Sequence, residues 1–207
     1  MRLRPALFLL ALAGCAPEYE PKLEQAQAKH AAAPSGRTET AVFAGGCFWC
    51  TEADFEKVPG VTGAVSGYTG GGTADPSYEQ VSAGGTGHYE AVRITYDPAR
   101  VSYAQLVDYY FRTIDPTDAG GQFCDRGESY RTAIFVAAEA QRELAQKEKA
   151  EADAALSAPV ATPILPAAPF YEAEAYHQDY HKRNGFKYQY YRTRCGRDAR
   201  LKQVWER

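Results

Sequence analysis

The sequence predicts a single α/β domain with a hydrophobic core. Segments with the period-two apolar alternation of strands are interspersed with segments that have the helical spacing of three or four residues. The chain has 207 residues, 45% of them hydrophobic, which is enough for one domain with a substantial core. The formal net charge of −3 provides none of the basic surface that nucleic-acid binding requires. We therefore expect no nucleic-acid partner.

The first 15 residues have the pattern of a bacterial lipoprotein signal peptide. Arg2 and Arg4 are followed by Leu7–Leu12, an apolar run too short to span a bilayer. Small residues then lead into Cys15, which resembles the lipobox cysteine that is lipidated and becomes the mature N-terminus. An ordinary secretory signal with an incidental cysteine is the alternative. We expect a protein anchored through lipid on Cys15, outside the cytoplasm and facing the periplasm.

Residues 16–38 are rich in Ala, Pro, Gln, Lys and Glu and have no sustained apolar stripe. This composition predicts a flexible tether, although a short helix over Leu23–Ala33 is an alternative. The tether leads into a domain over residues 39–192. A C-terminal tail, residues 193–207, follows.

The strand Ala41–Ala44, the pair Gly45-Gly46 and a helix over Phe48–Val58 place Cys47 at a strand-to-helix turn. A cysteine at the first turn of a helix faces unpaired N–H groups and the positive end of the helix dipole. We therefore expect a lowered pKa and a nucleophilic thiolate at Cys47. The alternative is a small buried hydrophobic residue.

The segment after this helix contains a strand over Val61–Tyr68 and two glycine-rich loops, at residues 70–72 and 84–87. Neither loop is followed by the Lys-Ser/Thr of a phosphate-binding loop. A strand over Tyr89–Asp97 comes next, with Val92, Ile94 and Tyr96 on one face and Glu90 in register with them. Burial on that face would raise the pKa of Glu90 and favour its protonated form, whereas a frayed strand end would leave Glu90 solvated.

A helix is predicted over Ser102–Ile114, and a polar loop over Thr117–Ser129 follows it. The next strand, Tyr130–Val136, begins with a tyrosine that points inward, either as a core residue or at the mouth of a site. A solvated helix over Ala138–Leu156 and an edge strand over Pro159–Leu165 complete this part.

A further helix, Glu172–Lys182, contains His177 and His181 at i,i+4 spacing. Because Gln178 occupies the position where a zinc protease needs Glu, we expect ordinary helix histidines and no metal ion. The region from Asn184 is basic and aromatic and carries Cys195.

Apart from Cys15, four cysteines remain: Cys47, Cys50, Cys124 and Cys195. In an oxidising compartment they invite disulfides, and three pairings are possible. Cys47 and Cys50 form a C-x-x-C, which is typical of a redox dithiol. Four-cysteine zinc is disfavoured because no second C-x-x-C exists. A cysteine hydrolase with His88 as base is a weaker alternative.

Four motifs occur in the order found in the A-type peptide methionine sulfoxide reductases. They are Gly46-Cys47-Phe48-Trp49, Gly67-Tyr68-Thr69-Gly70-Gly71, Gly87-His88-Tyr89-Glu90-Ala91-Val92 and Asp125-Arg126-Gly127-Glu128-Ser129-Tyr130-Arg131. The resemblance covers about residues 40–182. It implies a ferredoxin-like two-layer α/β sandwich with a mixed sheet and long loop extensions.

The resemblance also implies roles for individual residues. Cys47 would attack the sulfur of methionine S-sulfoxide, and Glu90 would protonate its oxygen. The residues implied to surround them are Tyr78 and Tyr130 as phenols that hold the oxygen, Asp125 as a water-mediated contact, and Phe48 and Trp49 as walls of the methyl pocket. Cys47 would become a sulfenic acid that a second thiol condenses to a disulfide.

Family members place this second, resolving cysteine either at the Cys50 position or in the C-terminal tail, and this chain has both. We expect Cys195 to resolve Cys47, because a flexible tail can reach the pocket; Cys50 is the alternative, and Cys124 is a further candidate. No bound cofactor is expected. An external, thioredoxin-like dithiol would restore the enzyme, which we expect to be a monomer acting on oxidised proteins or peptides. A thiol–disulfide oxidoreductase and a non-catalytic surface lipoprotein are the competing hypotheses.

Overall fold

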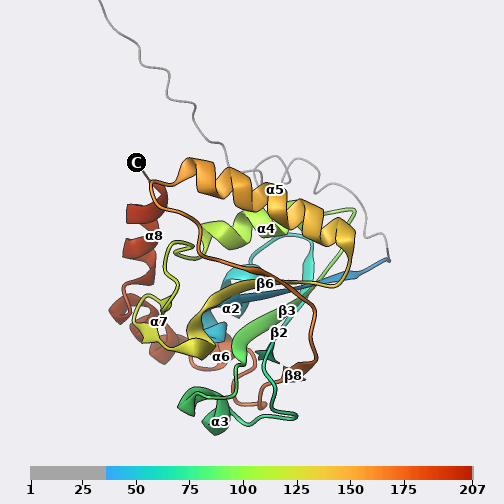
Figure 1. The fold of residues 1–207 in the computed structure, drawn as a ribbon. Coiled ribbons are helices and arrows are strands. Elements are labelled where there is room, and N and C mark those ends of the chain that lie inside the picture. Colours follow the sequence, from blue (N-terminus) through green and yellow to red (C-terminus); the bar gives the residue numbers. More distant parts are fainter. Residues whose placement is uncertain (1–35, 207) are drawn as a thin grey trace, which may run out of the picture.

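The computed structural model describes residues 36–206 (Figure 1). The predicted signal peptide, Cys15 and most of the predicted tether lie outside the described residues. Within the described part of the chain, no helix is long and apolar enough to cross a membrane.

Four strands and two helices form the central unit of the fold. In chain order they are β1 (Glu39–Gly45), α2 (Phe48–Phe55), β2 (Val61–Thr69), β3 (Tyr89–Tyr96), α4 (Tyr103–Arg112) and β6 (Thr132–Val136). The strands lie side by side in the order β6-β1-β3-β2, and all three of these pairings are antiparallel. This βαββαβ arrangement is the ferredoxin-like fold that the resemblance implies.

Short strands extend this sheet at both edges. β7 (Ile164–Pro166) pairs in parallel with β6, and β8 (Phe170–Glu172) pairs antiparallel with β2. The sheet therefore has six strands and is mixed, as expected. The edge strand predicted over Pro159–Leu165 is shorter and begins later. β8 was not anticipated.

The main core lies between the sheet and the helices α2 and α4. On β3, Val92, Ile94 and Tyr96 are fully buried, as the period-two pattern predicts. Phe43 of β1 packs between Phe55 and Tyr110, with ring centroids 5.1 and 5.0 Å away. Stacked aromatic rings thus join β1 to both helices, and such ring pairs stabilise the fold by more than their buried area alone.

Shorter elements occupy the connections between the main strands and helices. They are α3 (Tyr78–Ala83), β4 (Gly121–Gln122), β5 (Asp125–Arg126), the 3-10 turn η1 (Glu128–Tyr130), α5 (Glu139–Ala155) and α6 (Tyr180–Arg183). α3 was missed, although Ser77 and Gln80 form a capping box at its start. The helix predicted over Glu172–Lys182 is wrong in extent, because only α6 forms there. Tyr130 closes η1 and does not begin the following strand.

The expectation of a flexible C-terminal tail is wrong. Residues after Asn184 form α7 (Gly185–Arg194) and α8 (Arg197–Trp205), which lie against the domain (Figure 1). Trp205 donates a hydrogen bond from Nε1 to the Ile114 carbonyl at 3.2 Å, and Arg112 stacks on its ring. A disulfide between Cys195 and Cys124 joins the end of α7 to the β4–β5 turn.

Reduction of this disulfide should lower the free energy of unfolding by about 2–4 kcal/mol, because the bond closes a long loop in the unfolded chain. The two cysteines are 71 residues apart in sequence. Denaturant unfolding of the Cys47→Ser/Cys50→Ser variant, with and without dithiothreitol, measures this difference. Adding Cys124→Ser in the same background should abolish the response to dithiothreitol, and equal stability with the bond open and closed would contradict the prediction.

Candidate active site

A tight turn between β1 and α2 positions Cys47. Gly46 has a φ of +78°, and a Cβ added there would lie 2.5 Å from the Cβ of Gln122, so the turn requires glycine. Cys47 is the N-cap of α2, and its carbonyl accepts a hydrogen bond from the Cys50 N–H at 3.1 Å. The predicted strand–glycine–helix arrangement around Cys47 is confirmed.

Glu90 lies directly beside this helix start. It is 3% exposed at the entry of β3, and its Oε2 accepts a hydrogen bond from the Phe48 N–H at 2.9 Å. Burial raises the pKa of Glu90 to about 8, although hydrogen bonds from Phe48 and Tyr130 lower it in part. Glu90 is therefore a mostly protonated acid at neutral pH, and the alternative of a solvated strand end is excluded.

Cys47 and Glu90 line one cavity of about 80 Å³ together with most of the other predicted site residues. The remaining lining residues are Phe48, Trp49, Tyr78, Asp125, Tyr130 and Tyr191. Tyr191 is the only one of these that sequence reasoning did not single out. The three predicted candidates for the resolving cysteine, Cys50, Cys195 and Cys124, lie outside this lining.

Tyr78 and Tyr130 bring two hydroxyl groups to the cavity from different elements. Tyr78 is the first residue of α3, and its N–H donates to Glu174 Oε1 at 2.8 Å. Tyr130 ends η1, just before β6. Burial raises the pKa of both phenols. Both therefore remain protonated and can donate hydrogen bonds to an oxygen held between them and Glu90.

The opposite wall of the cavity is aromatic. Phe48 is 1% exposed. The Trp49 ring stacks on Tyr180 at 3.7 Å, and its Nε1 donates to His177 Nδ1 at 3.0 Å. The buried His177 thus fixes the indole, whereas His181 pairs with Glu56. The two histidines have separate partners and do not converge on a shared site.

The expected low pKa of Cys47 is not what the structure shows. Burial, then its hydrogen bond and charge interaction with Cys50, and the neighbouring Glu90 raise the pKa of Cys47 well above its ordinary value. The pKa of Cys50 falls to about 7, because it accepts a hydrogen bond from Cys47 and lies near Arg197 and Arg192. The helix terminus favours a thiolate at Cys47, but the loss of solvent around Cys47 outweighs that effect.

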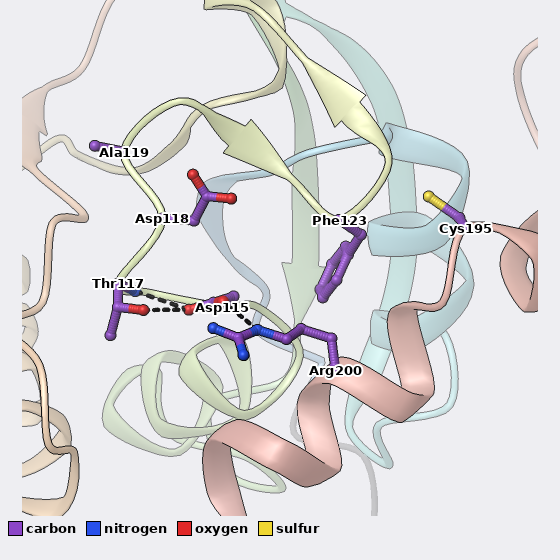
Figure 2. Close-up of a pocket in the computed structure, with 7 residues that line it drawn as sticks. All are labelled: Asp115, Thr117, Asp118, Ala119, Phe123, Cys195 and Arg200. Carbon is purple, nitrogen blue, oxygen red and sulfur yellow. Dashed lines mark hydrogen bonds and ion pairs between the residues drawn. The ribbon is translucent and has the colours of Figure 1, made fainter.

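A larger and more open hollow, of about 520 Å³, lies beside the disulfide (Figure 2). Arg200 Nε bonds Asp115 Oδ2 at 2.7 Å, and Thr117 bonds the other carboxylate oxygen of Asp115 at 2.6 Å. Cys195 lines this hollow, but Cys47 and Glu90 do not. The charged groups of this hollow are paired, Arg200 with Asp115 and Asp118 with Arg126 outside the lining, and its cysteine is in a disulfide. The smaller cavity is therefore the better candidate for chemistry.

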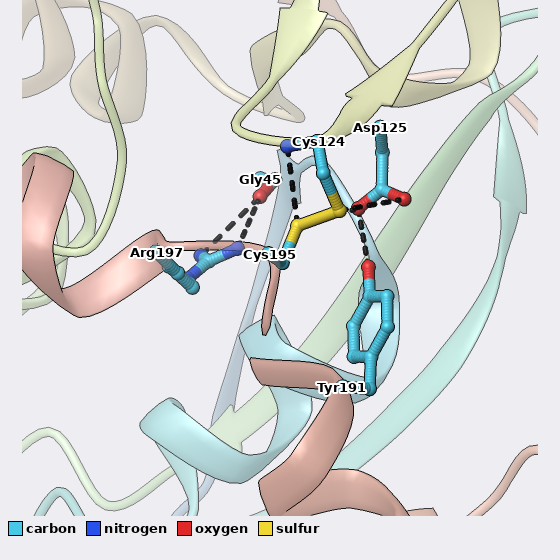
Figure 3. Close-up of a disulfide and its surroundings, with 6 residues drawn as sticks. All are labelled: Gly45, Cys124, Asp125, Tyr191, Cys195 and Arg197. Atoms are coloured by element: carbon cyan, nitrogen blue, oxygen red, sulfur yellow. Dashed lines mark hydrogen bonds between the residues drawn. A yellow bond between two sulfur atoms is a disulfide. The ribbon is translucent and has the colours of Figure 1, made fainter. Parts of the chain in front are cut away.

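The helix α7 lies against the β4–β5 hairpin, where Tyr191 contacts Asp125 and Cys195 contacts Cys124 (Figure 3). Tyr191 and Asp125 both line the smaller cavity. Tyr191 donates a hydrogen bond to Asp125, and its ring lies edge-on to Trp49 at 5.9 Å. Four residues later, Cys195 is bonded to Cys124, the neighbour of Asp125. The i,i+4 spacing of Tyr191 and Cys195 places both on one face of α7. That spacing was the available signal for Tyr191, but it required knowing that α7 is a helix.

Solved structures of similar fold include a methionine sulfoxide reductase. Reduced Mxr1 from Saccharomyces cerevisiae superposes with a TM-score of 0.70 at 31% identity, over 73% of this chain and 88% of Mxr1. Methionine sulfoxide reductase A of Corynebacterium diphtheriae gives a TM-score of 0.65 at 34% identity, over 72% of this chain and 77% of that protein.

Sequence comparisons agree with the structural ones. The peptide methionine sulfoxide reductase family model matches residues 39–207. The peptide methionine sulfoxide reductase MsrA 2 of Caulobacter vibrioides is 59% identical, covering 82% of this chain and 86% of the relative. MsrA of Bacillus licheniformis is 52% identical, covering 83% of this chain and 96% of the relative. The chain therefore belongs to the peptide methionine sulfoxide reductase family, and it is a peptide-methionine (S)-S-oxide reductase of the A type.

Proposed function

We propose that Cys47 attacks the sulfur of methionine S-sulfoxide while Glu90 protonates the sulfoxide oxygen, in free methionine sulfoxide and in oxidised proteins. The observation that supports this most directly is the hydrogen bond from the Phe48 N–H to Glu90, at 2.9 Å. Because Phe48 follows Cys47, that bond holds a neutral acid next to the nucleophile. A sulfoxide is a poor electrophile until its oxygen is protonated, and a well-placed acid makes the oxygen easier to remove.

In the proposed first step, the sulfoxide oxygen is protonated while Cys47 attacks the sulfoxide sulfur. The carboxylic acid of Glu90 gives its proton to the sulfoxide oxygen, and the sulfur of Cys47 forms a bond to the sulfoxide sulfur. The proton of the Cys47 thiol passes to the carboxylate of Glu90. The hydroxyl group then moves from the substrate sulfur to the Cys47 sulfur as the bond between the two sulfurs breaks. One electron pair returns to the substrate sulfur, which leaves methionine and a Cys47 sulfenic acid. Tyr78 and Tyr130 hold the oxygen, and Phe48 and Trp49 hold the methyl group.

Glu90→Ala should slow methionine formation by about 10²–10⁴-fold, the usual contribution of a positioned acid. Glu90→Gln should retain much more of the rate, because its amide still donates a hydrogen bond to the oxygen. Methionine released in a single turnover, without reductant, measures this step apart from enzyme recycling. Equal losses in the two variants would rule out the donor role.

The rate of that single turnover should be level below pH 8 and should fall above it. The pKa of Glu90 is raised to about 8, so the acid form persists through neutral pH and is lost as the pH rises past that value. Glu90→Gln, which cannot ionise, should show no fall near pH 8. A wild-type rate that increases through pH 8 would show that the proton is supplied elsewhere.

For the second step, we now favour Cys50 over Cys195 as the resolving cysteine. Cys195 was expected to reach the pocket on a flexible tail, but it lies at the end of the helix α7. Cys195 is bonded to Cys124 in this structure, whereas Cys50 has a free thiol hydrogen-bonded to Cys47. The thiolate of Cys50 would attack the Cys47 sulfenic acid, forming a disulfide as hydroxide leaves and takes up a proton to become water.

One equivalent of methionine sulfoxide, added without reductant, should therefore give a Cys47–Cys50 disulfide. Cys50→Ser should instead accumulate a Cys47 sulfenic acid that dimedone can trap. Peptide mapping by mass spectrometry identifies both products. A Cys47–Cys195 disulfide in the wild-type protein would restore the pairing first expected from the sequence.

We further propose that an external dithiol of the thioredoxin type reduces the resulting disulfide by thiol exchange. The yeast relative Mxr1 has been solved in complex with Trx2, and such a partner is consistent with this proposal. If the protein faces the periplasm, its reductant must be present there as well. No bound cofactor enters this scheme, because both reducing equivalents come from thiols.

We also propose that the enzyme is lipid-anchored outside the cytoplasm, where it repairs oxidised proteins. This proposal depends on the lipobox-like residues Leu12-Ala13-Gly14-Cys15. Cys15→Ala should prevent lipidation and move the protein from the membrane fraction to the soluble fraction, or leave it as an unprocessed precursor. Mass spectrometry of the mature N-terminus of the unsubstituted protein measures this directly, and a soluble, unlipidated protein would contradict the proposal.

A further inference from the structure

Cys50 shares one buried face of α2 with an acidic residue. Cys50 and Asp54 are four residues apart, so their side chains lie on the same side of the helix, one turn from each other. Both are buried, at 2% and 3% exposure. Cys50 also packs in a buried cluster with Cys47 and with Tyr188 of α7. The residues that reach Asp54 therefore lie close to the sulfur of Cys50.

The helix α7 brings a first guanidinium group to this face. Arg192 Nη1 lies 2.9 and 3.0 Å from the two carboxylate oxygens of Asp54, and it bonds the Tyr188 hydroxyl at 3.1 Å. Tyr188 is in contact with the cluster that includes Cys50. Arg192 thus bridges the acid and the aromatic residue that flank Cys50.

The helix α8 brings a second guanidinium group, from Arg197, which is 2% exposed. It donates hydrogen bonds to the carbonyl oxygens of Thr113, at 2.7 Å, and Gly45, at 3.3 Å. Figure 3 shows the contact with Gly45. Its Nε lies 3.8 Å from Asp54 Oδ2 and has no hydrogen-bond partner among the described residues. A buried guanidinium is costly unless an anion compensates it. Asp54, already bonded to Arg192, compensates Arg197 only at long range.

We propose that Arg192 and Arg197 are positioning residues that stabilise Cys50 as a thiolate, ready to attack the Cys47 sulfenic acid. The inference rests on the proposed function of Cys50 as the resolving thiol. Sulfur attack and loss of hydroxide need an anionic Cys50, and two cations held by the C-terminal helices favour that anion. These helices would then contribute to the second step of the reaction, although neither arginine lines the cavity of Cys47 and Glu90.

The other charged and titratable groups around Cys50 have opposite effects on the stability of its thiolate. Asp54 on α2, and Glu90 on β3 when it is ionised, disfavour the thiolate. Cys47 favours it by donating a hydrogen bond, and Tyr188 stays neutral because burial raises its pKa. Arg197 and Arg192 both lower the pKa of Cys50. With these groups together, the pKa of Cys50 is about 7, so removal of either cation should raise it.

A quenched-flow single turnover without reductant separates the two steps. The protein used begins at residue 16 and is otherwise unchanged. Methionine release reports the first step, and loss of dimedone-reactive Cys47 reports the second. Arg192→Gln and Arg197→Gln should each move the pH midpoint of the second step upward by about one unit, which would slow that step about fivefold at pH 7. Methionine release should change less than about twofold. Arg192→Lys, which keeps the charge, should restore the wild-type pH profile.

Arg194→Gln is the matched control, since it removes the same charge from an exposed position on α7. It should leave both steps unchanged. If the arginine variants slow both steps equally, or slow the second without moving its pH midpoint, the two residues act only through structure and the proposal fails. If Arg197→Gln does not fold, the comparison of Arg192→Gln with Arg192→Lys alone tests the proposal. If Cys50→Ser still forms a Cys47 disulfide, the proposed resolving role fails instead, whatever the arginine variants show.

Discussion

The hydrogen bond from the Phe48 N–H to Glu90 is the contact on which the active site depends. It joins the start of α2 to the entry of β3, through two residues that are 42 positions apart in sequence. The same burial that makes Glu90 a neutral acid also removes the solvent that would stabilise a Cys47 thiolate. Cys47, the proposed nucleophile, and Glu90, the proposed acid, are therefore both protonated, and in the proposed mechanism substrate binding starts the transfer of protons. A low-pKa cysteine alone would lack the acid that the sulfoxide oxygen requires.

The C-terminal helices complete this site from outside the ferredoxin-like unit. α7 supplies Tyr191, which bonds Asp125 and packs against Trp49, while α8 places Arg197 beneath the strand-to-helix turn. The Cys124–Cys195 disulfide joins the end of α7 to the β4–β5 turn, next to Asp125. Three distant parts of the chain thus bring together in space the cavity of Cys47 and Glu90, the Cys47–Cys50 pair and the disulfide.

The sequence predicted the features that depend on local pattern. Period-two alternation identified β3 and the face that Glu90 shares with Val92, and the glycine pair identified the turn at Cys47. Tyr78, Tyr130 and Asp125 came from motif resemblance, because nothing local distinguishes them from core or loop residues. The pKa of Cys47, the helices α7 and α8, and the pairing of Cys195 could not be predicted in this way. They depend on burial and on contacts between residues far apart in sequence, and the polar, aromatic composition after Asn184 resembles that of an exposed tail.

Glu90 is mostly an un-ionised acid at neutral pH, and it is held against the start of α2. Infrared difference spectroscopy of the reduced protein against Glu90→Gln measures this directly, through the carbonyl stretch of a protonated carboxyl group. We expect a band assignable to Glu90 at pH 7 that disappears with a midpoint near pH 8, in line with the pKa of about 8 that burial produces. A Glu90 that is already ionised at pH 6 would contradict it.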